Sequence, residues 1–231
     1  MSTLAFIPAR GGSSILYKNL KDLGGKPLIQ HSIDRLEECT RVDHVVCSTD
    51  SMKIATYAER DGRVQVAMRP PAYDPETWSV ADVLLNYLQD DAVNHEDLIA
   101  LVQPTSPFFS ALDLDTLINV MENEPTWASA QTICKIQHND HWINQRIWHD
   151  MSVEFKDWEA RKTQYNKQKK SQSWKFGNLI VVRRKNFLIT KNFFEYPSYG
   201  MEVSRWSALD IDMREDFIQA EALISAGVIK A

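Results

Sequence analysis

Two kinds of local pattern alternate along most of the chain. Short runs rich in apolar and β-branched residues, which predict strands, occupy residues 4–7, 42–47, 64–68, 98–102, 127–136 and 179–182. The segments between them, several with apolar residues at every third or fourth position, predict helices over residues 28–36, 51–61, 80–88, 114–121 and 217–224. Pro27 is expected at the start of the first helix, and Ser79 as the N-cap of the third. A last strand is expected over residues 208–212.

This alternation predicts a single α/β domain, residues 1–231, with a Rossmann-like, mostly parallel sheet and helices on both faces. The run 98–102 is entirely apolar, so it is expected at the centre of the sheet. Ligands of such sheets bind at the carboxyl ends of the strands. The loops that follow residues 7 and 102 are therefore expected on the same rim.

Residues 137–175 interrupt the pattern. They combine tryptophans (Trp142, Trp148, Trp158 and Trp174) with a run of arginines and lysines, and they lack helical periodicity. The segment is long for a simple connection, and its composition is typical of a subunit interface. It is predicted to be an inserted arm that mediates dimerisation, with a solvated loop as the alternative.

The opening loop has the composition of an anion-binding site. Gly11 and Gly12 follow the first predicted strand, and Arg10 and Lys18 stand at either end of the loop. Residues without a Cβ let backbone N–H groups approach a phosphate closely. A surface turn with two ordinary basic residues would look the same in these few positions.

Asp210 and Asp212 are the strongest catalytic candidates outside that loop. On a strand, residues two apart point to the same face, so both carboxylates could share one Mg²⁺, with Ile211 facing the core. Magnesium commonly takes one or two carboxylates together with phosphate oxygens. The alternative is that Asp212 caps the last helix and Asp210 is simply exposed.

Composition and missing motifs exclude several classes. A net charge of -5 argues against a dedicated nucleic-acid binder. Neither a P-loop nor a Gly-x-Gly-x-x-Gly string is present. Cys39, Cys47 and Cys134 are expected to be buried free thiols in a reducing cytoplasm, since neither a signal peptide nor a membrane span is expected. His138 and His141 are interpreted as surface residues, not as a metal pair.

Several motifs occur together in the order and spacing of one enzyme family. They are the segments 7–13, 18–19, 46–50, 69–70, 101–107 and 209–212. In this combination the chain resembles the nonulosonate cytidylyltransferases, which include the CMP-sialic, CMP-legionaminic and CMP-pseudaminic acid synthetases. The likeness covers nearly the full length.

The resemblance implies a nucleotide-diphospho-sugar transferase fold and transfer of CMP from CTP to a nonulosonic acid, with Mg²⁺ and release of pyrophosphate. It assigns the nucleotide to Ala9, Arg10, Gly11, Gly12, Ser13, Asn19, Arg69 and Ser79. It assigns the sugar acid to Gln103, Thr105, Lys175, Phe193 and Phe194, the two phenylalanines lining an acyl pocket or filling the core. Catalysis falls to Arg10, Lys18, Asp210 and Asp212, the two aspartates holding the metal. The arm would cross to the second subunit of a homodimer.

The chain departs from the family at two places. Ser14, Ile15, Leu16 and Tyr17 replace a lysine and glycine after the loop serine, which removes a phosphate-facing charge and one residue of loop. Gly177-Asn178 stands where the sialic-acid enzymes carry Asn-Gly and an aromatic, which predicts a changed sugar pocket. Two other functions therefore compete: a cytidylyltransferase for the eight-carbon acid of lipopolysaccharide, and a nucleotide- or sugar-binding relative without catalysis.

Overall fold

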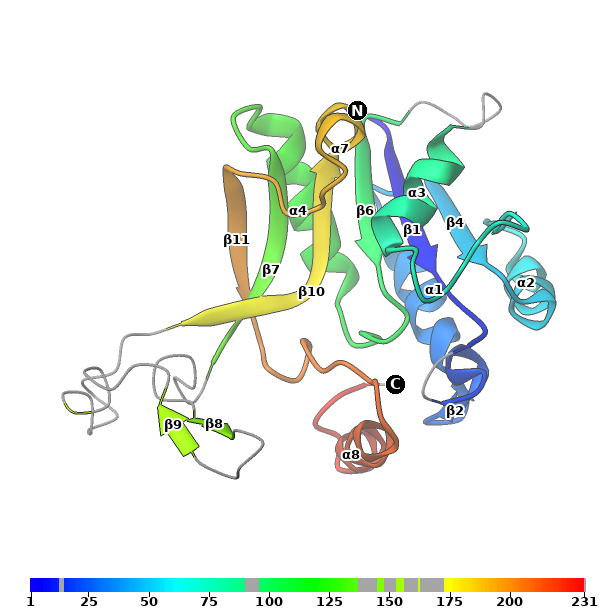
Figure 1. Ribbon diagram of the computed structural model, residues 1–231, viewed down its shortest axis with the longest axis vertical. Helices are drawn as coiled ribbons and strands as arrows, with labels where there is room; N and C mark the ends of the chain where they lie inside the picture. Colours follow the sequence, from blue (N-terminus) through cyan, green and yellow to red (C-terminus); the bar gives the residue numbers. More distant parts are fainter. Residues whose placement is uncertain are drawn as a thin grey trace.

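A seven-stranded mixed sheet forms the centre of the computed structural model, which describes residues 1–12, 15–89, 96–136, 145–147, 153–155, 162 and 173–230 (Figure 1). The strand order is β11-β7-β10-β6-β1-β4-β5. The strands are β1 Thr3–Pro8, β4 His44–Thr49, β5 Val64–Met68, β6 Leu98–Val102, β7 Ser129–Lys135, β10 Trp174–Arg183 and β11 Ser198–Val203. Of these, β10 runs antiparallel to both neighbours, whereas the other pairs are parallel. The predicted mostly parallel α/β sheet is confirmed.

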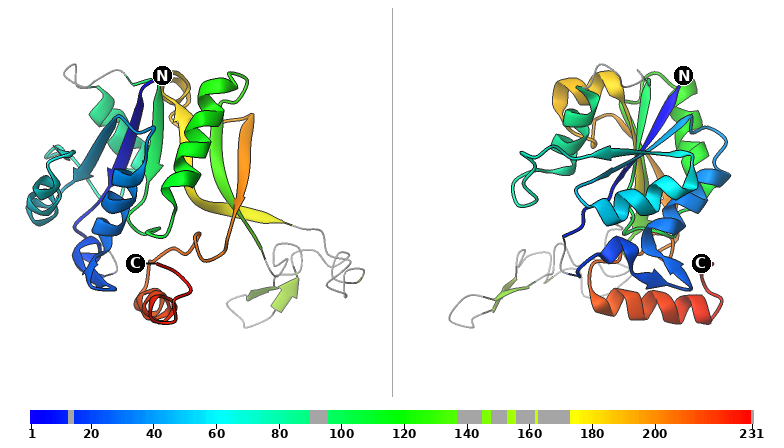
Figure 2. Two further views of the ribbon diagram at one scale, coloured as in Figure 1. Left: turned by 180° about the vertical axis from the view of Figure 1, so that it is seen from behind. Right: turned by 90° about the vertical axis from the view of Figure 1, so that its right-hand side faces the viewer.

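Helices cover both faces of the sheet (Figure 2). They are α1 Leu28–Glu38, α2 Met52–Ala58, α3 Val80–Leu88, α4 Ala111–Asn123, α7 Arg184–Thr190 and α8 Arg214–Ser225, with short 3-10 turns η1 Lys18–Leu20 and η2 Glu59–Asp61. Alternate residues of β1 separate the two layers: Ala5 and Ile7 pack in one core cluster with α1, α2 and α4. Leu4 and Phe6 pack in a second cluster with α3 and α7. The period-two pattern of a strand thus builds one core on each face.

A third, smaller cluster lies below the rim of the sheet. It contains Leu23, Leu28, Phe108, Ile211, Phe217 and Ala220. Leu23 belongs to the hairpin of β2 Asp22–Leu23 and β3 Lys26–Pro27, and Phe217 to α8. This cluster joins the segment after the opening loop to the C-terminal helix.

Most predicted elements are found within a few residues of their expected bounds. Strand β6 matches the prediction at both ends, and Ser79 is the N-cap of α3, with Asp82 completing a capping box. Pro27 is the N-cap of α1 and not its first residue. The predicted strand over 208–212 is wrong: these residues form an irregular segment between β11 and α8.

The described part of the predicted arm is small. It comprises a hairpin of β8 Gln145–Ile147 with β9 Val153–Phe155, Lys162, and the first residues of β10. Trp142, Trp148 and Trp158 lie outside the described residues. Trp174 is described, and its indole N–H donates to Glu202 of β11 at 3.0 Å. None of the helices among the described residues is long and apolar enough to cross a lipid bilayer.

Candidate active site

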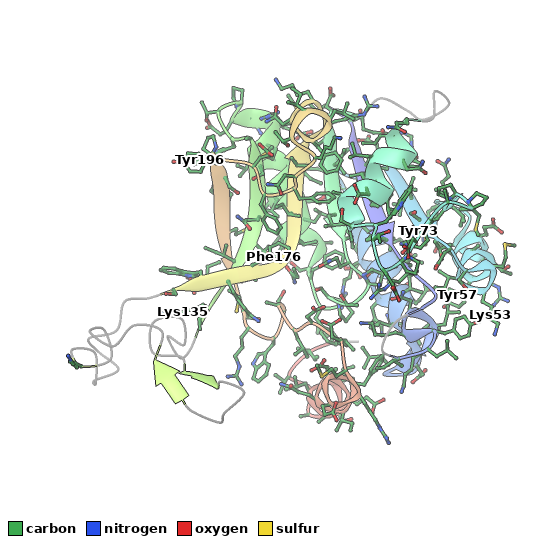
Figure 3. All side chains as sticks on the ribbon, in the orientation of Figure 1. Lys53, Tyr57, Tyr73, Lys135, Phe176 and Tyr196 are labelled. Carbon is green, nitrogen blue, oxygen red and sulfur yellow. The ribbon has the colours of Figure 1, made fainter. Side chains whose placement is uncertain are left out.

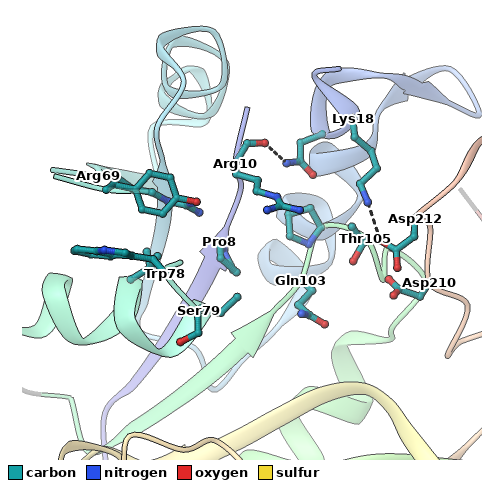
Figure 4. Close-up of a pocket in the computed structure, with 15 residues that line it drawn as sticks. Pro8, Arg10, Lys18, Arg69, Trp78, Ser79, Gln103, Thr105, Asp210 and Asp212 are labelled. Atoms are coloured by element: carbon teal, nitrogen blue, oxygen red, sulfur yellow. Dashed lines mark hydrogen bonds and ion pairs between the residues drawn. The ribbon is translucent and has the colours of Figure 1, made fainter. Parts of the chain in front are cut away.

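A pocket of about 390 Å³ opens at the carboxyl ends of β1 and β6 (Figure 4). The loop after β1 contributes Pro8 and Arg10, and the loop after β6 contributes Gln103, Pro104 and Thr105. These two loops were expected on one rim, and the structure places them there. Side chains from three other segments complete the wall: Lys18 and Asn19, Arg69 to Val83, and the pair Asp210 and Asp212.

One end of this pocket is charged, and we call Lys18, Thr105, Asp210 and Asp212 the carboxylate end. The ammonium group of Lys18 lies 2.8 Å from Oδ1 of Asp212, and the lysine side chain is only 8% exposed. Ser106 donates to Oδ1 of Asp210 at 3.3 Å, and Thr105 also hydrogen-bonds to this carboxyl group. A buried ammonium group therefore pairs with one of two neighbouring carboxyl groups.

The two aspartates differ in their affinity for protons. Burial in the pocket wall raises the pKa of Asp210 from its ordinary value, and the nearby charge of Asp212 raises it further. The hydrogen bond from Lys18 instead lowers the pKa of Asp212. The repulsion between the two carboxylates is reduced when Asp210 binds a proton or when a cation lies beside the pair.

Backbone contacts explain why both carboxylates face the pocket without a strand. The N–H of Ile211 donates to the carbonyl of Thr105 at 2.7 Å, and the Ile211 side chain is fully buried in the small cluster. Asp210 and Asp212, on either side of Ile211, therefore point away from the cluster and into the pocket, as expected from their spacing. The N-cap of α8 is Met213 and not Asp212, and Asp216 accepts from the N–H groups of both residues.

The other end of the pocket is aromatic, and we call Arg69, Tyr73, Trp78, Ser79, Val80 and Val83 the aromatic end. The rings of Tyr73 and Trp78 meet edge to face, with centroids 5.8 Å apart. The guanidinium of Arg69 lies 4.5 Å from the Tyr73 ring centroid and donates to its hydroxyl and to the carbonyl of Ser48. Burial lowers the pKa of Arg69. Among the described residues, its buried Nε has no hydrogen-bond partner, so a donor is available for a ligand.

The opening loop is shaped by contacts with the segment after β4. The N–H of Gly11 donates to Asp50 at 2.7 Å, and a Cβ on Gly11 would lie 2.9 Å from the Cβ of Ser51. Glycine is therefore required at this position. Asn19 donates to the carbonyl of Arg10 at 3.0 Å, which joins the two ends of the loop.

The predicted nucleotide-binding residues of this loop divide between two places. Arg10 and Asn19 line the pocket, whereas Gly11 and Gly12 line an adjacent depression that also contains Lys53. Ala9 is buried, and its N–H donates to Ser48. Ser13 lies outside the described residues.

Three of the predicted sugar-binding residues lie outside the pocket. Phe193 is buried in the core beside Phe187, with ring centroids 4.8 Å apart. Phe194 is 53% exposed and meets Phe176 edge to face. Lys175, the last residue of the arm segment, lies on β10 opposite Cys134 of β7. Gln103 and Thr105, by contrast, line the pocket.

Tyr73, Trp78 and Lys53 were not among the site residues predicted from the sequence. The first two were detectable, since they lie in a proline-rich loop directly after Arg69. Lys53 had no such signal. It reaches the opening loop from α2, where its ammonium group lies 4.3 Å from the ring centroid of Tyr17. The positive charge of Lys53 thus lies beside the opening loop, which lacks the lysine expected from the family resemblance.

Comparisons with known proteins give one consistent result. A family model described as cytidylyltransferase matches residues 4–227. An N-acylneuraminate cytidylyltransferase of Streptococcus agalactiae is 27% identical over 94% of the chain, and the chain spans about half (52%) of that relative's length. The CMP-N,N'-diacetyllegionaminic acid synthase of Legionella pneumophila is 29% identical, with 97% of both chains covered.

Two further proteins extend the comparison to eight-carbon acids. A 3-deoxy-manno-octulosonate cytidylyltransferase of Hydrogenovibrio crunogenus is 36% identical over 51% of the chain. A structure of CMP:2-keto-3-deoxy-manno-octonic acid synthetase complexed with CTP superposes with a TM-score of 0.74 over 98% of this chain and 100% of that one, at 18% identity. At that identity the likeness concerns the fold.

Proposed function

Because the chain belongs to the cytidylyltransferase family, we propose that it transfers CMP from CTP to the anomeric hydroxyl of a nonulosonic acid and releases pyrophosphate. The observation that carries the proposal is the polarity of the pocket, with an aromatic end and a carboxylate end on one rim. A nucleotide has the same polarity, with a flat base at one end and phosphates at the other. Two relatives that match most of the chain in sequence are, by their names, an N-acylneuraminate cytidylyltransferase and a CMP-N,N'-diacetyllegionaminic acid synthase.

The aromatic end suits a pyrimidine base. The edge-to-face pair of Tyr73 and Trp78 offers an apolar wall for the faces of the ring, and aromatic contacts of this kind favour binding. The buried, unpartnered Nε of Arg69 offers a donor for a carbonyl oxygen of the base. The base would thus be bound by contact with the two rings and by a hydrogen bond from Nε of Arg69, which has no partner among the described residues.

The carboxylate end suits phosphates and Mg²⁺. No group of three or more histidine, cysteine, aspartate or glutamate side chains that could hold a metal occurs among the described residues. Asp210 and Asp212 alone match the pair of carboxylates that Mg²⁺ takes when phosphate oxygens and waters complete its shell. When bound there, Mg²⁺ would neutralise phosphate charge. Lys18 and Arg10 would add fixed positive charge at the same place.

The chain's own part in the reaction is positioning and charge neutralisation. The anomeric oxygen forms a bond to the α-phosphorus, the bond from that phosphorus to the pyrophosphate oxygen breaks, and the hydroxyl proton leaves to solvent. Lys18, already buried beside Asp212, can stabilise negative charge that develops on the phosphate without reorganising. Gln103 lines the rim between the two ends, next to Thr105 of the carboxylate end, and the sugar acid would lie there.

We propose a homodimer for the same enzyme, with the arm of residues 137–175 crossing to the second subunit. The exposed Trp174 at the base of the arm supports this assignment. Light scattering of the intact chain should give twice the monomer mass, and deletion of residues 140–170 should give monomers. A monomeric intact chain would refute the dimer and leave the assignment of the reaction standing.

One experiment tests the reaction. Pyrophosphate release from CTP and Mg²⁺ is measured with sialic, legionaminic, pseudaminic and eight-carbon acids, with Asp210→Ala alongside. Release with a nine-carbon acid, lost in Asp210→Ala, is expected. Release with the eight-carbon acid alone would replace the proposed substrate, an outcome favoured by the short opening loop and by the 36% identical relative. CTP binding without release from any acid would indicate a binding protein.

A further inference from the structure

Strand β10 leaves its regular pairing with β7 between Phe176 and Ile180, where the register shifts (Figure 3 labels Phe176). At this irregularity, two backbone N–H groups of β10 bond to a side chain. Asn178 and Leu179 donate to the hydroxyl oxygen of Thr132 on β7, at 2.9 and 3.0 Å. Thr132 is fully buried, so its hydroxyl replaces water for both groups.

These contacts determine the orientation of the Asn178 amide. A hydroxyl has two lone pairs and one hydrogen, and the lone pairs of Thr132 are used by the two N–H groups. Its hydrogen is donated to Oδ1 of Asn178 at 2.8 Å, which is much closer than the carbonyl of Leu179 at 3.4 Å. The amide nitrogen of Asn178 must therefore face the opposite side. There it donates to the carbonyl of Ser207 at 2.7 Å and lies 3.2 Å from the Ser207 hydroxyl.

Gly177 allows this arrangement. A Cβ at this position would lie 2.5 Å from the hydroxyl oxygen of Thr132 and 2.9 Å from its Cβ. Any side chain would push the two strands apart and break the contacts of Thr132. Gly177, Thr132 and the 1% exposed Asn178 therefore form one buried unit.

The acceptor of this unit lies in the segment that carries the two aspartates. Residues 204–213 run from β11 past the bend of β10 to α8, without regular structure (Figure 1). On the side of Asp210 toward α8, the segment is bonded to Thr105 through Ile211 at 2.7 Å. On the side toward β11, Asn178 bonds Ser207, three residues before Asp210. The Asp210 backbone is thus held from both sides.

We infer that Asn178 is a positioning residue: through its bond to Ser207 it sets the place of Asp210 and Asp212 against Thr105. Asn178 does not line the pocket among the described residues and would act through the segment alone. Within the described residues, no hydrogen bond joins Asn178 to the aromatic end, residues 69–83. The inference rests on the proposed function only where metal binding and reaction rate are used to test it.

Hydrogen exchange tests the inference without reference to any reaction. In Asn178→Ala, amide groups of residues 208–213 should exchange about five- to tenfold faster, the effect of one lost hydrogen bond, while those of α3 keep their rates. Thr132→Ser retains the hydroxyl and should behave as the unaltered chain. Ile118→Ala, a buried change in α4, controls for lost stability. Unchanged exchange over 208–213, or an increase as general as in Ile118→Ala, would overturn the inference.

Metal binding gives a second readout. With CTP present, Mn²⁺ binding followed by electron paramagnetic resonance should weaken about ten- to hundredfold in Asn178→Ala, as for residues that orient metal ligands. CTP binding without metal should stay within twofold. If the reaction is as proposed, kcat of Asn178→Ala should be lower than that of the unaltered chain, and KM for CTP should be unchanged. If the unaltered chain binds no Mn²⁺, the metal assignment fails, and exchange alone decides the role of Asn178.

Discussion

The two ends of the pocket are built in different ways. The aromatic end comes from one stretch, residues 69–83, whose side chains contact each other and rest on the core cluster of Val83, Leu84 and Phe6. The carboxylate end joins Lys18 to Asp212, residues 194 positions apart, and rests on the small cluster around Ile211. One end is local and well supported, and the other depends on a few distant contacts.

This difference predicts which properties can be changed separately. Nucleotide affinity should depend on the aromatic end, whereas turnover and metal binding should depend on the carboxylate end. Substitutions within the small cluster should affect the carboxylate end and leave the aromatic end intact.

Lys18→Met is expected to have the largest effect. It removes a buried cation that pairs with Asp212, and loss of one preorganised charge donor typically lowers kcat about 10²–10³-fold. CTP affinity should change much less. Lys26→Met is the matched control, because Lys26 pairs with Asp34 outside the pocket. Equal losses of kcat in both variants would contradict the assignment of Lys18.

Phe217→Ala should lower stability by about 3 kcal/mol, since it removes a ring that is 98% buried in the small cluster. We expect kcat to fall as well, because Ile211 loses packing, while CTP affinity is retained. Phe187→Ala is the control, because it removes a similarly buried ring from the core cluster of Leu4 and Phe6. Urea unfolding and steady-state kinetics compare the two, and identical kinetic defects would show that the small cluster has no separate role.

Trp78→Ala should weaken CTP binding about tenfold, the usual contribution of one aromatic contact to a base. Calorimetry measures the affinity, and kcat at saturating CTP should stay within threefold. Trp78→Phe, which keeps an aromatic wall, should bind nearly as well as the unaltered chain. Unchanged affinity in the alanine variant would place the base elsewhere.

The smallest expected effect is a pH dependence of stability. Burial lowers the pKa of His31 from 6.5, and this ring bonds to the carbonyl of Leu23 in the small cluster. Below pH 6.5 the unfolded chain binds a proton that the folded ring does not, so stability is complete above that pH and declines below it. The free energy of unfolding should therefore fall as the pH is lowered from 7.5 to 5.5.

His31→Gln keeps a donor for Leu23 and cannot titrate, so this variant should lose that part of the pH dependence. His44→Gln, at a half-exposed site, is the control. The same pH profile for His31→Gln and the unaltered chain would exclude His31 as its source.

Local sequence determined most of the elements. The apolar run of β6 was predicted to the residue, because a strand buried on both faces needs a continuous apolar stretch. Ser79 likewise marked the start of α3, because the hydrogen bonds of an N-cap lie within one turn. The shared rim of the opening loop and the Gln103 loop followed from the parallel direction of β1 and β6.

Other features depended on which segments meet in space. Residues 208–212 have a strand-like pattern, yet they pair with no strand of the sheet that the structure describes. Ala208 and Leu209 bond within their own turn, and Ile211 donates to the loop carbonyl of Thr105. The place of Phe193 was similarly undetermined, because an aromatic residue fits a core as well as a ligand pocket. Its contact with Phe187 places it in the core.

The sequence by itself thus determined the strands, the helices, their order and the residue types available at the rim, since all of these depend on neighbouring positions along the chain. Only the tertiary structure decided that Lys18 meets Asp212, that Ile211 bonds Thr105 and that Asn178 holds Ser207. The physical reason is that hydrogen bonds, ion pairs and ring contacts act over a few ångströms. Residues far apart in the chain acquire such partners only when the sheet and its helices bring them together.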